Sequence, residues 1–169
     1  MEKLHLSGNR LEEVPASFGE MPNLGDLDLS SNNLGRNPAL LRRLVKLKRL
    51  KKLNLADNRL EELPTSLGEI PNLEDLNLCC NNLETLPSSL GGLQTLKSLS
   101  LHGNEHLGFP EFLDQLPRLE KMTWGKTLWG PYGGSDTESC LTKLRKKGVE
   151  VELVWDKENE GQYITYSSD

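Results

Sequence analysis

A pair of leucines separated by one residue returns at regular intervals, and it constrains the fold more than any other feature of the chain. The second members of successive pairs are 23, 26, 23, 23 and 23 residues apart. The pairs are Leu4/Leu6, Leu27/Leu29, Leu53/Leu55, Leu76/Leu78 and Leu99/Leu101, and Met122/Trp124 stands in the sixth place. Six copies in register predict a repeat architecture in which each unit stacks on its neighbours.

The two halves of the repeat predict different local structures. Leucines that alternate with period two face the same side of a short strand. Three residues after each pair comes an asparagine, whose amide can both donate to and accept from neighbouring turns; these are Asn9, Asn32, Asn58, Asn81 and Asn104. The second half reads LxxLPxxLGxI over residues 60–70, where Pro and Gly favour tight turns or short helices. One repeat cannot bury its leucines alone, so we expect one continuous core.

These motifs resemble the 23-residue class of leucine-rich repeats, as found in Ras-group intracellular scaffolds and in small bacterial repeat proteins. The resemblance covers about residues 1–129 and includes six repeats, the second of them longer. It implies an α/β fold: a curved right-handed solenoid with a parallel sheet on its concave side and turns or short helices on its convex side. Family members bind unrelated partners, so the resemblance implies a protein-binding module without naming the partner.

Residues 130–169 depart from the repeat and are expected to form a C-terminal cap. Ser135 and Glu138 have the spacing of a capping box, which predicts a helix through Leu141 and Leu144. The following VEVELVW alternates as a strand. A second strand of a hairpin is expected near residues 163–166. At the other end, Met1 already occupies a leucine position, so we expect either a longer parent protein or a separate cover for that end.

The long second repeat predicts a helix on the convex side, with Asn37 as its N-cap and Pro38 as its first residue. Its leucines at positions 40, 41, 44 and 47 fit one helical face. Seven of the eleven residues from 42 to 52 are basic. These side chains form either a solvated surface or a contact for acidic protein, lipid headgroups or phosphate; the patch would comprise Arg42, Arg43, Lys46, Lys48 and Arg49.

The strand residues that do not face the core are expected to line the concave surface. They are polar and mostly small, with acidic Asp26, Asp28 and Asp75 near the middle and Asp57 just beyond. We therefore expect a protein partner that offers Lys or Arg. The partner-binding residues predicted on this face are His5, Asp26, Asp28, Lys52, Asn54, Asp57, Asp75, Asn77, Cys79, Ser100 and His102.

The sequence gives only weak support for a catalytic or metal-binding site at this surface. Cys79 and His102 occupy the same column in adjacent repeats, and Asp57 or Asp75 could orient the imidazole, but a wet strand surface offers no pocket or oxyanion donors. Cys79, Cys80 and His102 lack the CxxC spacing of common zinc sites. We therefore predict no catalytic residues, no metal and no cofactor.

The function predicted from the sequence is a non-catalytic protein–protein interaction module in the cytoplasm. Three cysteines, an odd number, and the absence of any Asn-x-Ser/Thr acceptor favour a reducing compartment. A net charge of −5 disfavours nucleic acid as the main partner. Two alternatives remain: electrostatic docking to nucleic acid or an anionic membrane through residues 42–52, and a thiol-dependent enzyme around Cys79.

Overall fold

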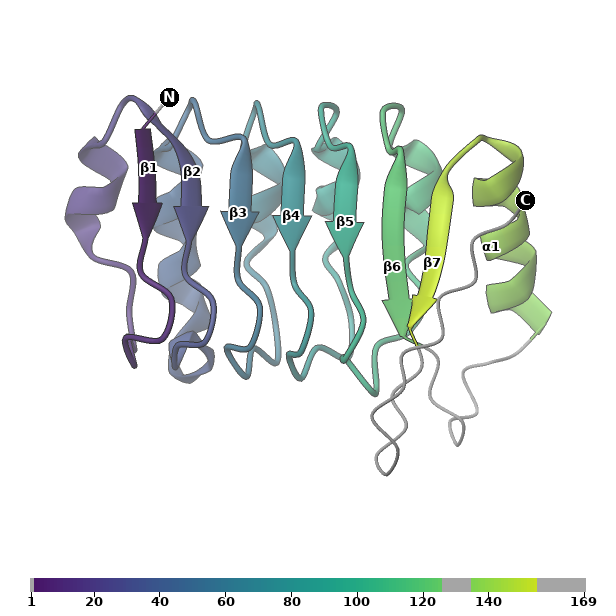
Figure 1. The fold of residues 1–169 in the computed structure, drawn as a ribbon, viewed down its shortest axis with the longest axis horizontal. Helices are drawn as coiled ribbons and strands as arrows, with labels where there is room; N and C mark the ends of the chain where they lie inside the picture. Colours follow the sequence, from purple (N-terminus) through teal and green to yellow (C-terminus); the bar gives the residue numbers. More distant parts are fainter. Residues whose placement is uncertain (1, 126–134, 155–169) are drawn as a thin grey trace.

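Seven strands form one parallel sheet, in the same order as they occur in the sequence (Figure 1). The computed structural model describes residues 2–125 and 135–154, apart from the side chains of residues 36, 38–40, 135, 136 and 138. The strands are β1 Glu2–His5, β2 Leu24–Asp28, β3 Lys52–Asn54, β4 Asp75–Asn77, β5 Ser98–Ser100, β6 Lys121–Gly125 and β7 Glu150–Val154. This arrangement confirms the predicted solenoid of stacked repeats.

The register of the sheet aligns equivalent residues of successive repeats into rows. The first leucine of each pair lies beside its counterparts on the neighbouring strands, and each member of this row from β2 to β6 is at most 2% exposed. These residues are Leu27, Leu53, Leu76, Leu99 and Met122. Leu4 and Leu6 are only partly buried, because β1 is the first strand of the sheet and is covered by the second repeat on one side.

The asparagine side chain after each of β2 to β5 bridges two repeats by hydrogen bonds, as predicted. Asn58 is fully buried, and its Nδ2 donates to the carbonyl oxygens of Leu29 at 2.9 Å and Leu55 at 3.1 Å. Its Oδ1 accepts the N–H of Leu34 at 3.3 Å. The same bond to the preceding repeat is made by Asn32, Asn81 and Asn104. Because buried backbone groups must be paired, this ladder stabilises the exits of the first five strands.

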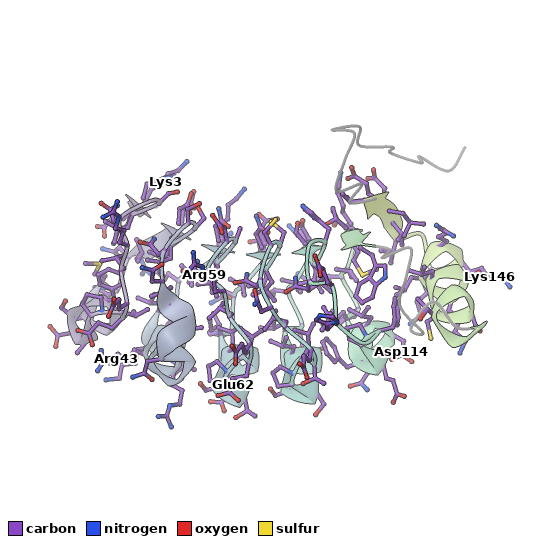
Figure 2. All side chains as sticks on the ribbon, turned by 90° about the horizontal axis from the view of Figure 1, so that it is seen from below. Lys3, Arg43, Arg59, Glu62, Asp114 and Lys146 are labelled. Atoms are coloured by element: carbon purple, nitrogen blue, oxygen red, sulfur yellow. The ribbon has the colours of Figure 1, made fainter. Side chains whose placement is uncertain are left out.

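Short 3₁₀ helices cover the other face of the sheet. They are η1 Ala16–Glu20, η2 Leu34–Arg36, η3 Pro38–Lys46, η4 Thr65–Glu69, η5 Ser88–Gly92 and η6 Glu111–Gln115. Figure 2 shows Glu62 and Asp114 on this helical side and Lys3 on the opposite side. A Cβ on Gly68 would lie 2.0 Å from the carbonyl oxygen of Ser89, so only glycine fits between η4 and η5.

The helix predicted in the long second repeat forms as the nine-residue 3₁₀ helix η3. Leu41, Leu44 and Leu47 are buried, and their spacing of three residues matches the three residues per turn of a 3₁₀ helix. Asn37 stands at the N-cap position, but its side chain makes no capping hydrogen bond. The predicted position of the cap was therefore correct, and the predicted capping interaction was wrong.

The C-terminal part adds the α-helix α1, Ser135–Lys146, and the strand β7 to the solenoid. Leu141 and Leu144 of α1 are buried, as is Val151 of β7. Gly148, with φ of +84°, lies between the two elements. Strand β7 pairs in parallel with β6, so it continues the sheet. The predicted capping box of Ser135 and Glu138 and the predicted hairpin near residues 163–166 lie outside the described side chains and residues.

Candidate functional site on the exposed sheet face

The face of the sheet opposite the 3₁₀ helices presents two rows of side chains that run across the strands. The first, which we name the charged row, consists of Lys3, Asp26, Lys52, Asp75, Ser98, Lys121 and Glu150. The second, the turn row, consists of His5, Asp28, Asn54, Asn77, Ser100, Thr123 and Glu152. Both rows follow from the alternation of side chains along each strand.

A shallow hollow of about 250 Å³ lies over the middle of this face. Eight of the eleven residues predicted to bind a partner line it: His5, Asp26, Asp28, Lys52, Asn54, Asp75, Asn77 and Ser100. The three others, Asp57, Cys79 and His102, lie at the strand exits, outside the hollow. The structure thus brings most of the predicted residues into one surface.

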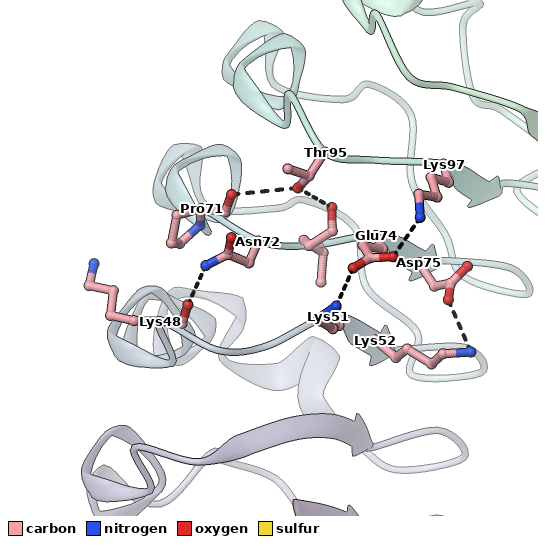
Figure 3. A network of polar contacts seen from close by, with 10 residues as sticks. Lys48, Lys51, Lys52, Pro71, Asn72, Glu74, Asp75, Thr95 and Lys97 are labelled. Carbon is pink, nitrogen blue, oxygen red and sulfur yellow. Dashed lines mark hydrogen bonds and ion pairs between the residues drawn. The ribbon is translucent and has the colours of Figure 1, made fainter. Parts of the chain in front are cut away.

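The acidic side chains of the charged row have basic neighbours, which the sequence analysis did not take into account. The Nζ of Lys52 lies 3.1 Å from Asp75, and the Nζ of Lys3 lies 3.6 Å from Asp26 (Figure 3 shows the first pair). The hydrogen bond to Asp75 raises the pKa of Lys52 above its usual value. The hollow nevertheless holds three carboxylates and one ammonium group, so its formal charge is negative.

Three residues of the turn row also hold the strand exits in place. An oxygen of Asp28 accepts the N–H of Ser30 at 2.9 Å, and Asn54 and Asn77 accept the N–H two residues ahead at 3.1 Å each. Burial raises the pKa of Asp28, but hydrogen bonds from the Ser30 side chain and backbone outweigh burial and bring the pKa below its usual value. Asp28 therefore carries its negative charge in a fixed position.

A second ion-pair network lies at the edge where the strands begin, and sequence reasoning missed it. Glu74 lies 2.7 Å from Lys51 and 2.9 Å from Lys97, as Figure 3 shows. Hydrogen bonds from these two lysines lower the pKa of Glu74 to about 2. The signal was present in the sequence, because the three residues are spaced by 23 and so share one column of the repeat.

Two of the basic residues of segment 42–52 have hydrogen-bond partners within the protein. Arg43 donates to the carbonyl oxygen of Val14, and Arg49 donates to the Asn23 side chain at 2.7 Å. Lys52 lies on the sheet face, whereas Lys46 ends η3 on the helical side. The remaining members of the predicted patch are the exposed Arg42 and Lys48. The predicted basic patch therefore stays a prediction, with Arg43 and Arg49 already bonded to other parts of the chain.

Cys79, Cys80 and His102 come together at the exits of β4 and β5, where one ligand atom of each lies within 4.8 Å of the others. Burial, followed by the influence of Cys80, raises the pKa of the Cys79 thiol to about 12. Such a thiol is protonated at neutral pH, whereas a nucleophilic cysteine needs a lowered pKa. The Nδ1 of His102 lies 2.9 Å from the hydroxyl of Thr123, and Asp75 pairs with Lys52. This geometry does not favour the thiol-dependent enzyme.

Comparison with known proteins identifies the repeats. Profiles described as leucine-rich repeat match residues 48–105 and residues 1–21. No curated protein matches the chain. In residues 2–125 and 135–154, no helix has both the length and the apolar character needed to cross a membrane.

Several solved structures are similar to this chain. A leucine-rich-repeat protein of Leptospira interrogans superposes with a TM-score of 0.65 and 29% identity, over 89% of this chain and 32% of that one. InlP of Listeria monocytogenes gives 0.60 and 28%, over 74% and 34%. The structure of the Toll–Spatzle complex of Drosophila gives 0.61 and 24%, over 72% and 17%, and at this identity the likeness shows the fold alone. The chain spans about a third or less of each matched chain. By its repeats, its sheet and these matches, the chain is a leucine-rich-repeat protein.

Proposed function

We propose that the protein binds a partner protein on the exposed sheet face, with a basic group of the partner seated in the central hollow. Leucine-rich-repeat domains generally mediate protein–protein interactions, and this family membership supports the general part of the proposal. The face and the chemistry of the partner are supported by the residues of the hollow.

The observation that carries the proposal is the negative hollow itself. Asp26, Asp28 and Asp75 contribute three carboxylates around the single ammonium of Lys52. Asp28 is held in place by Ser30, so its charge is oriented before a partner arrives. An oriented charge gives specificity and association rate at an interface, because complementary potentials steer the encounter.

A lysine or arginine of the partner could be accommodated without unfolding any part of the sheet. Lys52 and Asp75 have side chains that are 56% and 40% exposed, so their ion pair is accessible to solvent. Exposed ion pairs are weak and readily exchanged. An incoming guanidinium group can form two parallel hydrogen bonds with one carboxylate, which an ammonium group cannot do.

The proposal places the module in the cytoplasm. The cysteines Cys79, Cys80 and Cys140 are free thiols in the structure, which supports a reducing compartment.

The test compares partner capture by the wild type and by the triple variant Asp26→Asn, Asp28→Asn, Asp75→Asn. Asparagine is suited to this purpose, because Asn54 and Asn77 already make the same turn bond in the same row as Asp28. Proteins retained from a cytosolic lysate are identified by mass spectrometry, and their affinities are then measured with purified components. We expect the triple variant to bind the retained partner at least about tenfold more weakly, on the order of 1.4 kcal/mol.

A matched control removes the same charge elsewhere. Glu61, Glu62 and Glu69 are exposed, and Figure 2 places Glu62 on the helical side. A triple variant with Gln at these positions should retain the partner. If it loses the partner as fully as the Asp variant does, total charge and not the sheet face governs binding. Equal capture by the wild type and the Asp variant would remove the hollow from the interface.

A further inference from the structure

Cys79, Cys80 and His102, which we name the thiol cluster, converge although two of them are adjacent in sequence. The two sulfur atoms and one imidazole nitrogen lie within 4.8 Å of one another. Adjacent residues of a regular strand point to opposite faces, so a strand alone could not produce this arrangement. The cluster therefore depends on how the chain leaves β4.

The backbone turns sharply at Cys80, which has φ of +55°. Its N–H donates to the carbonyl oxygen of His102 at 2.9 Å, while the N–H of Cys79 donates to Asn77 Oδ1 at 3.1 Å. This left-handed turn allows the Cys80 sulfur to lie on the same side as the Cys79 sulfur, within 4.8 Å of it. The turn therefore brings the two adjacent cysteines together, although they lack the CxxC spacing of common zinc sites.

The same turn recurs in the first five repeats, but the residue type that occupies it changes. The residue before each ladder asparagine has φ between +52° and +73°; these residues are Gly8, Ser31, Asp57, Cys80 and Gly103. Glycine adopts this conformation freely, whereas a residue with a Cβ does so at an energetic cost. Residues held in such strained backbone conformations are often found at functional sites.

The next repeat leaves room for the sulfur of Cys80. A Cβ on Gly103 would lie 3.0 Å from the Cys80 nitrogen and 3.1 Å from its Sγ. Any larger residue at position 103 would therefore displace Cys80. Gly103, which has no side chain, therefore leaves the space that the side chain of Cys80 occupies.

The imidazole of His102 is oriented by a hydrogen-bond partner of its own. Its Nδ1 lies 2.9 Å from the hydroxyl of Thr123, a residue that is only 9% exposed. In the tautomer with the proton on Nδ1, the ring donates to the Thr123 hydroxyl. Metal-binding histidines are commonly held by such a bond from the second nitrogen.

We propose that the thiol cluster binds one Zn²⁺ ion through the two thiolates and the imidazole, with water in the fourth position. Zinc lies about 2.3 Å from sulfur and about 2.0 Å from nitrogen, so ligands on one tetrahedral ion are roughly 3.5 to 3.8 Å apart. The ligand atoms lie within 4.8 Å of one another, so they would have to approach by about 1 Å to reach these distances. The set of two sulfurs and one nitrogen suits a thiophilic ion over Mg²⁺ or Ca²⁺.

Binding releases protons. A cysteine binds zinc as a thiolate and not as a thiol. Each cysteine therefore exchanges its S–H proton for a bond to the metal, with about two protons released to solvent per ion. Affinity for Zn²⁺ should fall as pH is lowered, because protons compete for the sulfurs.

The experiment titrates the chelator-treated, fully reduced chain with Zn²⁺ by calorimetry in two buffers of different ionisation enthalpy. Co²⁺ serves as the spectroscopic probe, because thiolate ligation gives a charge-transfer band that an oxygen site lacks. We expect one ion per chain, proton release, and a band of thiolate-to-cobalt type. The wild type failing to bind under reducing conditions, or binding without proton release, would overturn the proposal.

The repeats themselves supply the variants that keep the fold. The double variant Cys79→Ser, Cys80→Ser recreates the Ser30–Ser31 pair that the second repeat carries at these positions. His102→Ser recreates Ser7 or Ser30 of the same column. Both should weaken zinc binding by at least about tenfold, and Thr123→Val should weaken it by about tenfold through loss of ring orientation.

Cys140→Ser is the matched control, because this third thiol lies in α1. The control should bind Zn²⁺ as the wild type does. Equal affinity of the double cysteine variant and the wild type would exclude the cluster, and loss of binding in Cys140→Ser would show that the metal is held elsewhere. Since the zinc titration needs no partner protein, its outcome is independent of the function proposed above.

Discussion

The charged row and the thiol cluster lie on the same sheet face, yet they present different chemistry. In the charged row, Lys52 and Asp75 have well-exposed side chains and carry full charges. In the thiol cluster, Cys79 is half-buried and neutral, since burial raises its pKa to about 12. Both regions rest on the same leucine core and asparagine ladder. The difference therefore arises only from side chains at positions that the repeat leaves variable.

This comparison separates two kinds of position. Frame positions, such as the leucines of the core, the ladder asparagines and Gly68, are buried or tightly packed, and they should determine stability. Sheet-face positions are exposed or half-exposed, and they should determine what is bound. The predictions below test this division, beginning with the largest expected loss of stability.

Removing one of the asparagines that bridge the repeats should reduce the free energy of unfolding the most. Asn58→Ala would leave the carbonyl oxygens of Leu29 and Leu55 and the N–H of Leu34 without this partner in a fully buried environment. We expect a loss of about 3–5 kcal/mol in the free energy of unfolding, measured by urea denaturation. Asn54→Ala, which removes the bond to Ala56 on the half-exposed sheet face, should cost about 1 kcal/mol or less. Similar losses of stability for the two variants would contradict the distinction between frame positions and sheet-face positions.

Adding a side chain at the contact between two 3₁₀ helices should reduce the free energy of unfolding somewhat less. In Gly68→Ala the new Cβ would lie 2.0 Å from the Ser89 carbonyl oxygen, so η4 and η5 must move apart. We expect a loss of about 1–3 kcal/mol. Gly108→Ala is the control, since its Cβ would meet only the Glu84 carbonyl oxygen at 3.9 Å. Thermal melts of the two variants should differ clearly, and equal melting temperatures would argue against tight stacking at Gly68.

Neutralising the hollow should leave the fold almost unchanged. The triple Asp→Asn variant at positions 26, 28 and 75 loses exposed ion pairs but keeps the capacity for the turn bond at position 28. We expect its free energy of unfolding to stay within about 1 kcal/mol of the wild type. A much larger loss would mean that the charged row belongs to the frame, and that binding defects of this variant reflect misfolding.

The smallest effect is expected at Glu74, and it depends on pH. The pKa of Glu74 is about 2 in the folded state against an ordinary value of 4.5, because Lys51 and Lys97 donate hydrogen bonds to its carboxylate. Its contribution to stability is complete above pH 4.5 and is lost as the pH falls towards 2. The melting temperature of Glu74→Gln should therefore lie slightly below that of the wild type near neutral pH and converge with it near pH 2. A difference that persists at pH 2 would contradict this origin.

The fold could be predicted from the sequence wherever the information was periodic. The period-two leucines placed the strands, and the asparagines three residues later placed the ladder, because each repeat reuses the same contacts. The charged row could also have been predicted from the sequence. Lys3, Asp26, Lys52 and Asp75 stand in one column of the repeat, so their alternation of charge follows from the register. A count of the acidic residues alone does not reveal these ion pairs, because each pair joins two repeats.

The thiol cluster was harder to predict, because it depends on one backbone angle. Sequence spacing placed Cys79 beside His102, and the structure confirms that proximity. The position of the Cys80 sulfur depends on the left-handed turn, which sequence alternation does not reveal. Gly8 and Gly103 in the same column were the available signal, since glycine commonly marks such a conformation. The type of helix in η3 was similarly hidden, although the spacing of its buried leucines by three was visible.

The central claim, that the sheet face is the binding surface, is tested most directly by lysine acetylation of the complex. Lys52 lies on the sheet face and Lys46 lies at the end of η3, and both are exposed in the free protein. The protein would be acetylated with and without the partner recovered by capture, and modification at each lysine would be measured by mass spectrometry. Our account predicts that the partner slows acetylation of Lys52 and leaves that of Lys46 unchanged. Protection of Lys46 with Lys52 still reactive would contradict it, and would move the interface to the helical side.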